Sequence, residues 1–333
     1  MRSGPAIAQR ARIEARRAAV EQAQGRLREA IAWCERAIAD AEIGQAKDAL
    51  AHGLNVLDSA YVALGQPDRA THGRRALQLF DELGELSQKA GLLNNLGILA
   101  YYDGGWDEAL ASYREAREAW EQAGDRWAAS FAASNIAEVL SSQGRLDEAA
   151  PLLRDVLRVS QAAGTRSRVA TALAELGKLE ARRGEIAGAL ARLRDARAIF
   201  AELGEEAAAL DVDARIAEAL VLGGDAERAG ALARRALGRA EDADAGPLSA
   251  PVLLRVLGLA HLLAGRLEPG REALRRSVAA AEAIRSNYDV AVALDALAHA
   301  ERLAGADGAA AARRDALFER LGIVSTPLPR ISA

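Results

Sequence analysis

Apolar residues recur at three- and four-residue intervals from Leu92 to Gly124, with one interruption at Gly104 and Gly105. After the interruption the apolar positions are Ala109, Leu110, Tyr113, Ala116 and Trp120. This period is typical of one buried stripe on a helix. Gly104 stands where a helix needs a left-handed residue to end. The pattern therefore predicts a hairpin of two helices.

The turn glycine of this hairpin has counterparts along the whole chain. They stand 39 to 41 residues apart, at Gly25, Gly65, Gly104, Gly144, Gly184, Gly224, Gly265 and Gly305. A second series keeps a spacing of 40 and is expected to close the second helix of each hairpin, at Gly44, Gly84, Gly124, Gly164 and Gly204. Two interleaved series of one period are hard to obtain by chance from 29 glycines. They predict eight helical hairpins.

This register divides the chain into eight repeats and a tail. The predicted repeats are 6–44, 45–84, 85–124, 125–164, 165–204, 205–246, 247–286 and 287–322, and the tail is 323–333. One hairpin cannot bury its own apolar stripe, so neighbouring hairpins are expected to stack. Acidic, small and proline residues between Glu241 and Pro251 predict a hinge or protease-sensitive connection. The two prolines of the tail predict an extended or disordered segment.

Composition agrees with a helical protein, because half of the residues are apolar and only 4% are aromatic. Charged residues make up 27% of the chain and nearly cancel, at a net charge of −4. A broad basic face is not expected, so neither nucleic acid nor an anionic membrane is a predicted partner. The N-terminal residues show no uninterrupted apolar core and no cleavage pattern, and no apolar run has the length of a membrane span, so neither a signal peptide nor a membrane helix is expected. We expect a cytoplasmic protein.

The sequence shows no common catalytic or phosphate-binding motif. Its four histidines are spread over three of these repeats, and Cys34 is the single cysteine. A metal site or a catalytic dyad is therefore not expected. We predict a protein that is not an enzyme, with no catalytic residue, no cofactor and no metal.

The order of Leu96-Gly97, the turn glycine, Ala109, Tyr113 and Ala116 resembles the tetratricopeptide repeat. The repeat here is longer than the usual length of about 34 residues. The resemblance implies an all-α fold, a right-handed superhelix or solenoid of eight antiparallel helix pairs. It also implies that the first helix of each pair lines a concave groove.

Partners of this family bind along that groove, so its wall supplies the candidate binding residues. They are Asn55, Asn94, Ile98, Tyr101, Tyr102, Ser134, Asn135, Glu138, Lys178, Arg182, Arg215, Glu218, Arg255 and His299. Some members bind a carboxylate at the end of a peptide with Lys, Asn and Arg. Glu138 and Glu218 stand at such positions here, so that ligand is not expected. Trp106, Trp120 and Phe131 are expected to fill the seam between hairpins, whereas Tyr101 and Tyr102 are open to either role.

Four segments together are similar to a narrower group: IAWCERAIADAE, ATHGRRALQLFDELGELSQKAGLLNNLGILAYYDGGWDEAL, AEVLSSQGRLDEAAPLL and LFERLGIVSTPLP. They resemble the C-terminal repeat region of actinobacterial multidomain regulators, which also carry a class III adenylate/guanylate cyclase domain and an ATPase module of the AAA or STAND type. The resemblance implies a sensory or scaffolding arm that binds a partner or restrains those modules. Neither the metal-binding aspartates of the cyclase nor the phosphate loop of the ATPase occurs in this chain.

Three functions stay open. The leading hypothesis is a scaffold that binds a protein or peptide, with a cyclase or ATPase module in cis or in trans as the expected partner. The second is a sensor of an anionic metabolite or nucleotide, which Arg182, Arg215 and Arg255 in successive repeats would favour. The third is an oligomerisation arm, with a homodimer as its product.

Overall fold

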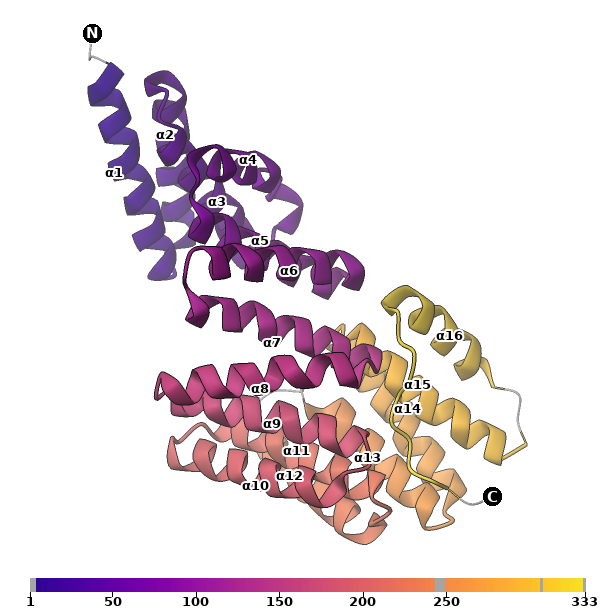
Figure 1. Ribbon diagram of the computed structural model, residues 1–333. Helices are drawn as coiled ribbons and strands as arrows, with labels where there is room; N and C mark the ends of the chain where they lie inside the picture. Colours follow the sequence, from indigo (N-terminus) through magenta and orange to yellow (C-terminus); the bar gives the residue numbers. More distant parts are fainter. Residues whose placement is uncertain (1–3, 243–248, 306–307, 332–333) are drawn as a thin grey trace. The chain divides into compact units, whose positions relative to one another are not determined.

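The computed structural model describes residues 4–242, 249–305 and 308–331. Within these ranges it contains sixteen α-helices, one short 3-10 helix and no strand, which confirms the predicted all-α repeat fold (Figure 1). The first eight helices are α1 (Gly4–Ala23), α2 (Leu27–Gly44), α3 (Lys47–Ala63), α4 (Gly73–Leu83), α5 (Leu86–Asp103), α6 (Trp106–Gln122), α7 (Arg126–Gln143) and α8 (Leu146–Ala162). The other eight are α9 (Arg166–Arg182), α10 (Ile186–Glu202), α11 (Glu206–Leu222), α12 (Ala226–Asp242), α13 (Ala250–Leu263), α14 (Leu267–Ala283), α15 (Asn287–Leu303) and α16 (Ala309–Leu321). The 3-10 helix η1 (Pro67–Arg69) lies between α3 and α4.

All eight predicted turn glycines follow an odd-numbered helix and have a positive φ, between 68° and 87°. At Gly104, the amide donates to the carbonyl of Tyr101 at 3.1 Å, and the next amide donates to Ala100 at 2.9 Å. These bonds satisfy carbonyls that the end of α5 leaves free. Glycine adopts this backbone without the steric cost of a Cβ atom, which is why the turns leave a periodic trace in the sequence.

Gly44 differs from the other glycines of the second series. It is the last residue of α2, and the left-handed residue is the following Gln45, with a φ of 52°. A Cβ at Gly44 would lie 2.7 Å from the backbone nitrogen of Ala8. Glycine is therefore required there by the close approach of α1, and Gln45 takes the left-handed conformation of the turn.

The chain forms two compact units, each of which is described by itself. Unit 1 comprises residues 1–99 and 111–129, and unit 2 comprises residues 100–110 and 130–333. In unit 1, Leu54, Phe80 and alanines of α1 to α4 form one core, and Cys34 lies in a second. Burial raises the pKa of the Cys34 thiol to about 12, which agrees with a packing role for this residue.

In unit 2, alanine, leucine and valine residues from α9 to α16 form one continuous core. The odd-numbered helices pack on each other in succession, α9 on α11, α11 on α13 and α13 on α15, as well as on their even-numbered neighbours. Even-numbered helices are not in comparable contact with each other in the described ranges. The odd-numbered helices therefore form the inner layer of unit 2, and their exposed side chains form its inner wall.

The predicted hinge between Glu241 and Pro251 falls largely on residues 243–248, which lie outside the described ranges. Residues 323–331 belong to neither a helix nor a strand. Across the described part of the chain, no helix combines the length and the apolar character needed to cross a membrane.

Candidate functional site

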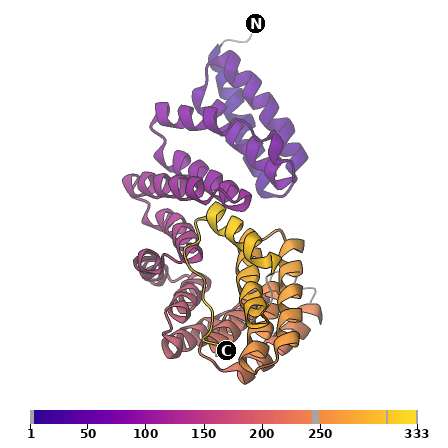
Figure 2. The same ribbon diagram turned by 90° about the vertical axis from the view of Figure 1, so that its right-hand side faces the viewer.

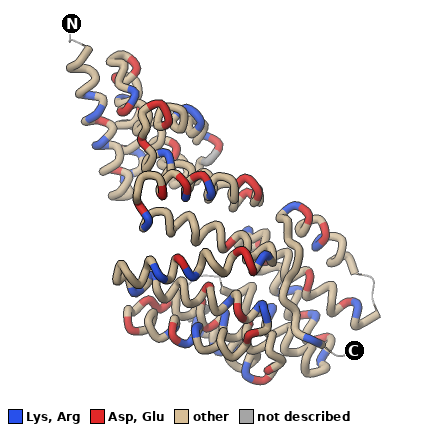
Figure 3. Tube along the Cα trace, in the orientation of Figure 1, with Lys and Arg blue, Asp and Glu red and all other residues tan. Residues whose placement is uncertain are grey.

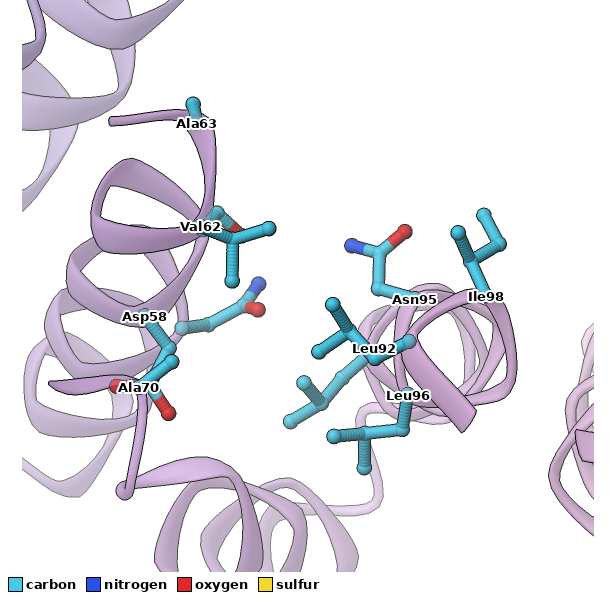
Figure 4. A pocket seen from close by; sticks show the side chains of 11 residues that line it. Asp58, Val62, Ala63, Ala70, Leu92, Asn95, Leu96 and Ile98 are labelled. Carbon is cyan, nitrogen blue, oxygen red and sulfur yellow. The ribbon is translucent and has the colours of Figure 1, made fainter. Parts of the chain in front are cut away.

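Unit 1 contains a pocket of about 250 Å³ between α3 and α5. Val62 of α3 faces Leu92 and Asn95 of α5 across this pocket (Figure 4). Two of the predicted groove residues line it, Asn55 from α3 and Ile98 from α5. The lining is mostly apolar and includes four polar side chains, those of Asn55, Asp58, Ser59 and Asn95. Such a lining can hold an apolar group and orient it through a small number of polar contacts.

Asn55 is half-buried, and its Oδ1 atom is shielded from solvent without a hydrogen-bond donor in the described structure. Buried polar atoms nearly always have a partner, because leaving one unpaired costs free energy. A carboxamide can also both donate and accept. Asn55 therefore contributes a buried acceptor without a donor to the lining of the apolar pocket.

Asp58 lines the same pocket but already has partners. It is buried and accepts hydrogen bonds from the backbone N–H of His72 and from the His72 ring nitrogen Nδ1, both at 2.7 Å. These bonds fix the segment after η1, which places Ala70 at the pocket. The role of Asp58 is therefore to position the wall. The predicted Asn94 is half-buried on α5, and its neighbour Asn95 is the asparagine of α5 that lines the pocket.

An aromatic cluster lies in unit 2. The Tyr101 ring stacks on Trp106 at a centroid distance of 5.5 Å, and Trp106 lies 6.0 Å from Tyr288. Tyr102 packs edge-on against Tyr101 and is 73% exposed. Trp106 is buried, as predicted. The cluster therefore presents one open tyrosine on a rigid aromatic base.

Trp120 is buried in unit 1, as predicted, but the prediction for Phe131 in unit 2 is wrong. Phe131 is 38% exposed, and the guanidinium of Arg168 lies 3.8 Å from the centre of its ring. A cation over an aromatic face is attracted by the ring's electron density. This contact covers the ring without placing it in the core.

Charged residues on successive odd-numbered helices pair with each other along the inner wall of unit 2. Arg215 donates to Glu175 at 2.6 Å and to Asp211 at 2.8 Å. Arg255 donates to Glu218 at 2.5 Å and lies 4.0 Å from Asp289. Glu218 and Arg255 are buried, so these two predicted groove residues hold neighbouring helices together and have little surface left for a partner.

Arg182 connects three odd-numbered helices of unit 2. It donates at 2.7 Å to the carbonyl oxygen of Ser141 near the end of α7, and it also donates to the hydroxyl of Tyr288 on α15. Its Nε atom is buried without an acceptor in the described structure. Lys178, one turn earlier on α9, has its Nζ 4.0 Å from the carboxylate of Glu175.

The pKa values of two carboxylates of this wall are shifted in opposite directions. Partial desolvation on the inner wall raises the pKa of Glu138, although its side chain stays exposed, and the charge of Glu175 raises the pKa further. Burial would also raise the pKa of Glu175, but the charges of Arg215 and Lys178 outweigh it and lower that pKa to about 2. Glu138 keeps solvent contact and accepts from the Tyr101 hydroxyl at 3.4 Å. It is therefore the carboxylate of this wall that is most open to a new partner.

The remaining predicted groove residues are partly buried and belong to neither the pocket nor the ion pairs described above. Ser134 and Asn135 are half-buried on α7. His299 is half-buried on α15, and burial lowers the pKa of its imidazole, as does the charge of Arg302. Among the described residues, no group of three His, Cys, Asp or Glu side chains is placed to hold a metal ion.

Sequence reasoning did not single out Tyr288, Asp289, Leu92 or Leu96 for this wall and pocket. Leu92 and Leu96 follow the helical stripe and are indistinguishable by spacing from core leucines. Tyr288 and Asp289 stand at the start of α15. Acidic residues are common in the first turn of a helix, so the position of Asp289 does not indicate an ion pair.

Comparison with protein families finds the tetratricopeptide repeat in two overlapping matches, residues 88–162 and 128–202. A comparison with curated protein sequences found no match.

Solved structures of similar fold include three repeat proteins. A Signal Transduction ATPase with Numerous Domains (STAND) protein with a tetratricopeptide repeat sensor, from Pyrococcus horikoshii, is 17% identical with a TM-score of 0.62. That match covers 79% of this chain and 40% of the other, so the chain spans less than half of that protein. The Rap conjugation gene regulator of the plasmid pLS20, in complex with the Phr* peptide, is 16% identical with a TM-score of 0.60, covering 83% and 75%. Aspartyl phosphate phosphatase F from Bacillus subtilis is 14% identical with a TM-score of 0.64, covering 100% and 99%.

At these identities the likeness concerns the fold and does not transfer an activity. The family matches, the periodic turn glycines and the sixteen described helices agree with each other. The chain is therefore an all-helical protein of tetratricopeptide-like repeats, with residues 88–202 matched as tetratricopeptide repeats.

Proposed function

We propose that this protein is a non-catalytic scaffold that binds an extended peptide, either free or as a segment of a protein partner. The observation that carries the proposal is the apolar pocket of unit 1, whose lining residue Asn55 has a buried oxygen without a hydrogen-bond donor. An extended peptide presents backbone N–H groups and alternating side chains. One N–H can satisfy Asn55 while a neighbouring apolar side chain enters the pocket.

The size of the pocket favours a peptide over a whole metabolite. Pockets that enclose small molecules usually measure about 300–1,000 Å³, and this one measures about 250 Å³. A single large apolar side chain fits that space as the anchor of a longer ligand. Leu92, Leu96 and Leu99 would surround it.

The alternative is a sensor of an anionic metabolite or nucleotide that binds Arg182, Arg215 and Arg255. The ion pairs of the inner wall argue against it, because carboxylates already neutralise Arg215 and Arg255. An anion would have to displace Glu175 or Glu218 from these arginines. Basic and acidic residues are also mixed along the helices of both units (Figure 3).

We place this scaffold in the cytoplasm, as a regulatory arm of a bacterial signalling system. The sequence resemblance to cyclase-associated repeat regions supports the proposal, as does a fold shared with a STAND ATPase sensor and a peptide-bound Rap regulator. Repeat folds of this kind are typically non-catalytic and bind partners on extended surfaces. The proposed partner is a cyclase or ATPase module, in cis or in trans, and a second copy of the chain is the alternative.

The test is selection of binders from a displayed library of random extended peptides, followed by titration of the selected peptides. Asn55→Ala is expected to weaken their binding about tenfold, because it removes one buried hydrogen bond to the ligand. Gln122→Ala, which removes an exposed amide of unit 1 that does not line the pocket, is the control and should leave the affinity unchanged. If neither substitution changes the affinity, the unit 1 pocket is not the binding site. If the library yields no binders, peptide binding is refuted.

A further inference from the structure

The segment after α16 is docked on the inner layer of unit 2. Figure 2 shows it passing between the magenta helices that begin unit 2 and the orange helices near its end. Ile323 is buried, and Leu328 and Ile331 pack against the large core of unit 2. From Val324 to Pro327 the side chains are exposed or only partly covered, and Val324 is 72% exposed, whereas Pro329 is buried. This mixture of anchored and exposed positions is typical of a bound peptide.

One backbone hydrogen bond and one side-chain hydrogen bond hold the start of the segment against the end of α7. The N–H of Val324 donates to the carbonyl of Gln143 at 2.9 Å. In return, the side-chain Nε2 of Gln143 donates to the carbonyl of Leu321 at 3.1 Å. Gln143 is the last residue of α7, and the last carbonyls of a helix have no partner within it. The segment therefore satisfies a free helix end, as an added extended peptide would.

A side-chain contact holds the middle of the segment against α15. The Thr326 hydroxyl donates to Asp295, whose other oxygen accepts from Arg314 at 3.1 Å. Asp295 is buried, so it needs both donors. The prolines at 327 and 329 keep the segment extended, which limits the entropy lost on docking.

We propose that this face of α7 and α15 is a peptide-binding surface and that residues 323–331 are its internal ligand. External ligands would be extended peptides that carry a hydroxyl residue followed by proline and apolar residues, and they would compete with the segment. This inference rests on the proposed function, since it gives a peptide-binding scaffold a second site with its own occupant. It lies in unit 2 and shares no residue with the pocket of unit 1.

Two full-length variants release the segment in different ways. Val324→Pro removes the N–H that bonds Gln143 and changes a mostly exposed side chain, and Val324→Ala keeps that N–H as its control. Gly144→Ala would place a Cβ 2.8 Å from the backbone oxygen of Ser325. Gly144 has a φ of 87°, so the substitution also strains the turn, and Gly184→Ala is the matched control because its φ is 83° and no atom lies within 4 Å of its Cβ.

The probe is a synthetic peptide with the sequence of residues 321–331, added to each full-length chain. Binding is measured by fluorescence anisotropy of the labelled peptide, and release of the segment by hydrogen exchange of its amides. Val324→Pro should exchange faster and bind the peptide about tenfold or more tightly than the wild type, because the site is no longer occupied. Gly144→Ala should also exchange faster but not bind, since its methyl group blocks the external peptide too. Both controls should behave as the wild type.

Equal peptide affinity for the wild type and Val324→Pro would overturn the proposal, as would unchanged exchange of the segment in that variant. Should Val324→Pro fail to fold by circular dichroism, Thr326→Val takes its place, because it removes the bond to Asp295 at nearly constant volume. The result is independent of the peptide selection that tests the unit 1 pocket. If the peptide selection fails and the peptide of residues 321–331 binds as expected, only the unit 1 pocket is refuted. If the selection succeeds and this peptide does not bind as expected, only the internal ligand is refuted.

Discussion

Arg255 on α13 donates a hydrogen bond of 2.5 Å to Glu218 on α11, and the two side chains are only 7% and 10% exposed. Arg255 is thereby placed 4.0 Å from Asp289 on α15. One arginine thus connects three successive helices of the inner layer of unit 2. Because burial removes the solvation of these charges, the stack depends on each having its partner.

Arg255→Met is expected to destabilise the chain by about 3–5 kcal/mol, since it leaves Glu218 buried and unpaired. The measurement is urea unfolding followed by circular dichroism. Arg275→Met is the control, because Arg275 pairs with Glu272 at 3.5 Å on the surface and should contribute less than about 1 kcal/mol. The double variant Arg255→Met with Glu218→Leu should recover most of the loss. Equal losses for Arg255→Met and Arg275→Met would contradict this account of the buried pair.

The low pKa of Glu175, about 2 against a usual 4.5, predicts a pH-dependent contribution to stability. A carboxyl whose pKa is lower in the folded state stabilises fully above its unfolded pKa and loses that effect as pH falls toward its folded pKa. Glu175→Gln should therefore lower the free energy of unfolding by about 3 kcal/mol at pH 7. The difference from the wild type should shrink between pH 4.5 and pH 2. A difference that stays constant over that range would rule out the lowered pKa.

Glu138 should behave in the opposite way, because partial desolvation and the charge of Glu175 raise its pKa. Its charged form is disfavoured in the folded chain, so Glu138→Gln should raise the melting temperature at neutral pH. The gain should vanish once the pH falls below the usual pKa of 4.5, where the carboxyl is protonated in both folded and unfolded chains. Thermal unfolding at several pH values checks both parts, and a loss of stability at neutral pH would count against the raised pKa.

Gly258 should not tolerate even one added methyl group. A Cβ there would lie 2.5 Å from Cγ of Leu274 and 3.1 Å from the carbonyl of Gly270, at the crossing of α13 and α14. Overpacking of this kind usually costs about 1–3 kcal/mol, so Gly258→Ala should lower stability by that amount. Gly238→Ala on α12 is the control, because no atom lies within 4 Å of its Cβ. It should stabilise the chain by up to about 1 kcal/mol through helix propensity, and similar effects at both positions would contradict the packing argument.

The repeat fold could be predicted from sequence because each turn needs a left-handed residue. That conformation is costly for residues with a Cβ atom, so Gly25 and its seven counterparts mark the turns visibly. Gln45 shows the limit of the rule, since Gly44 is needed for the contact with Ala8 and the left-handed position falls to glutamine. The spacing of the glycines indicates neither the contact of Gly44 with Ala8 nor the left-handed conformation of Gln45.

The candidate sites could be predicted only as a set of wall positions. The resemblance to the repeat family places Glu218 and Arg255 on the inner layer, but their pairing depends on side-chain conformations that the repeat pattern does not fix. The docked segment left no periodic signal either, because it is not part of a repeat. Its contact between Gln143 and Leu321 joins residues 178 positions apart in the sequence. Such a long-range contact emerges only from the folded chain.

Calorimetric titration of the full chain with a selected peptide tests the peptide-binding claim most directly. The account predicts saturable binding of one peptide to the unit 1 pocket, with a negative heat-capacity change from burial of its apolar side chain. Asn55→Ala should weaken that binding, and Gln122→Ala should not. Absence of saturable heat for every selected peptide, or equal affinity in the wild type and Asn55→Ala, would contradict the assignment of this pocket as a peptide site.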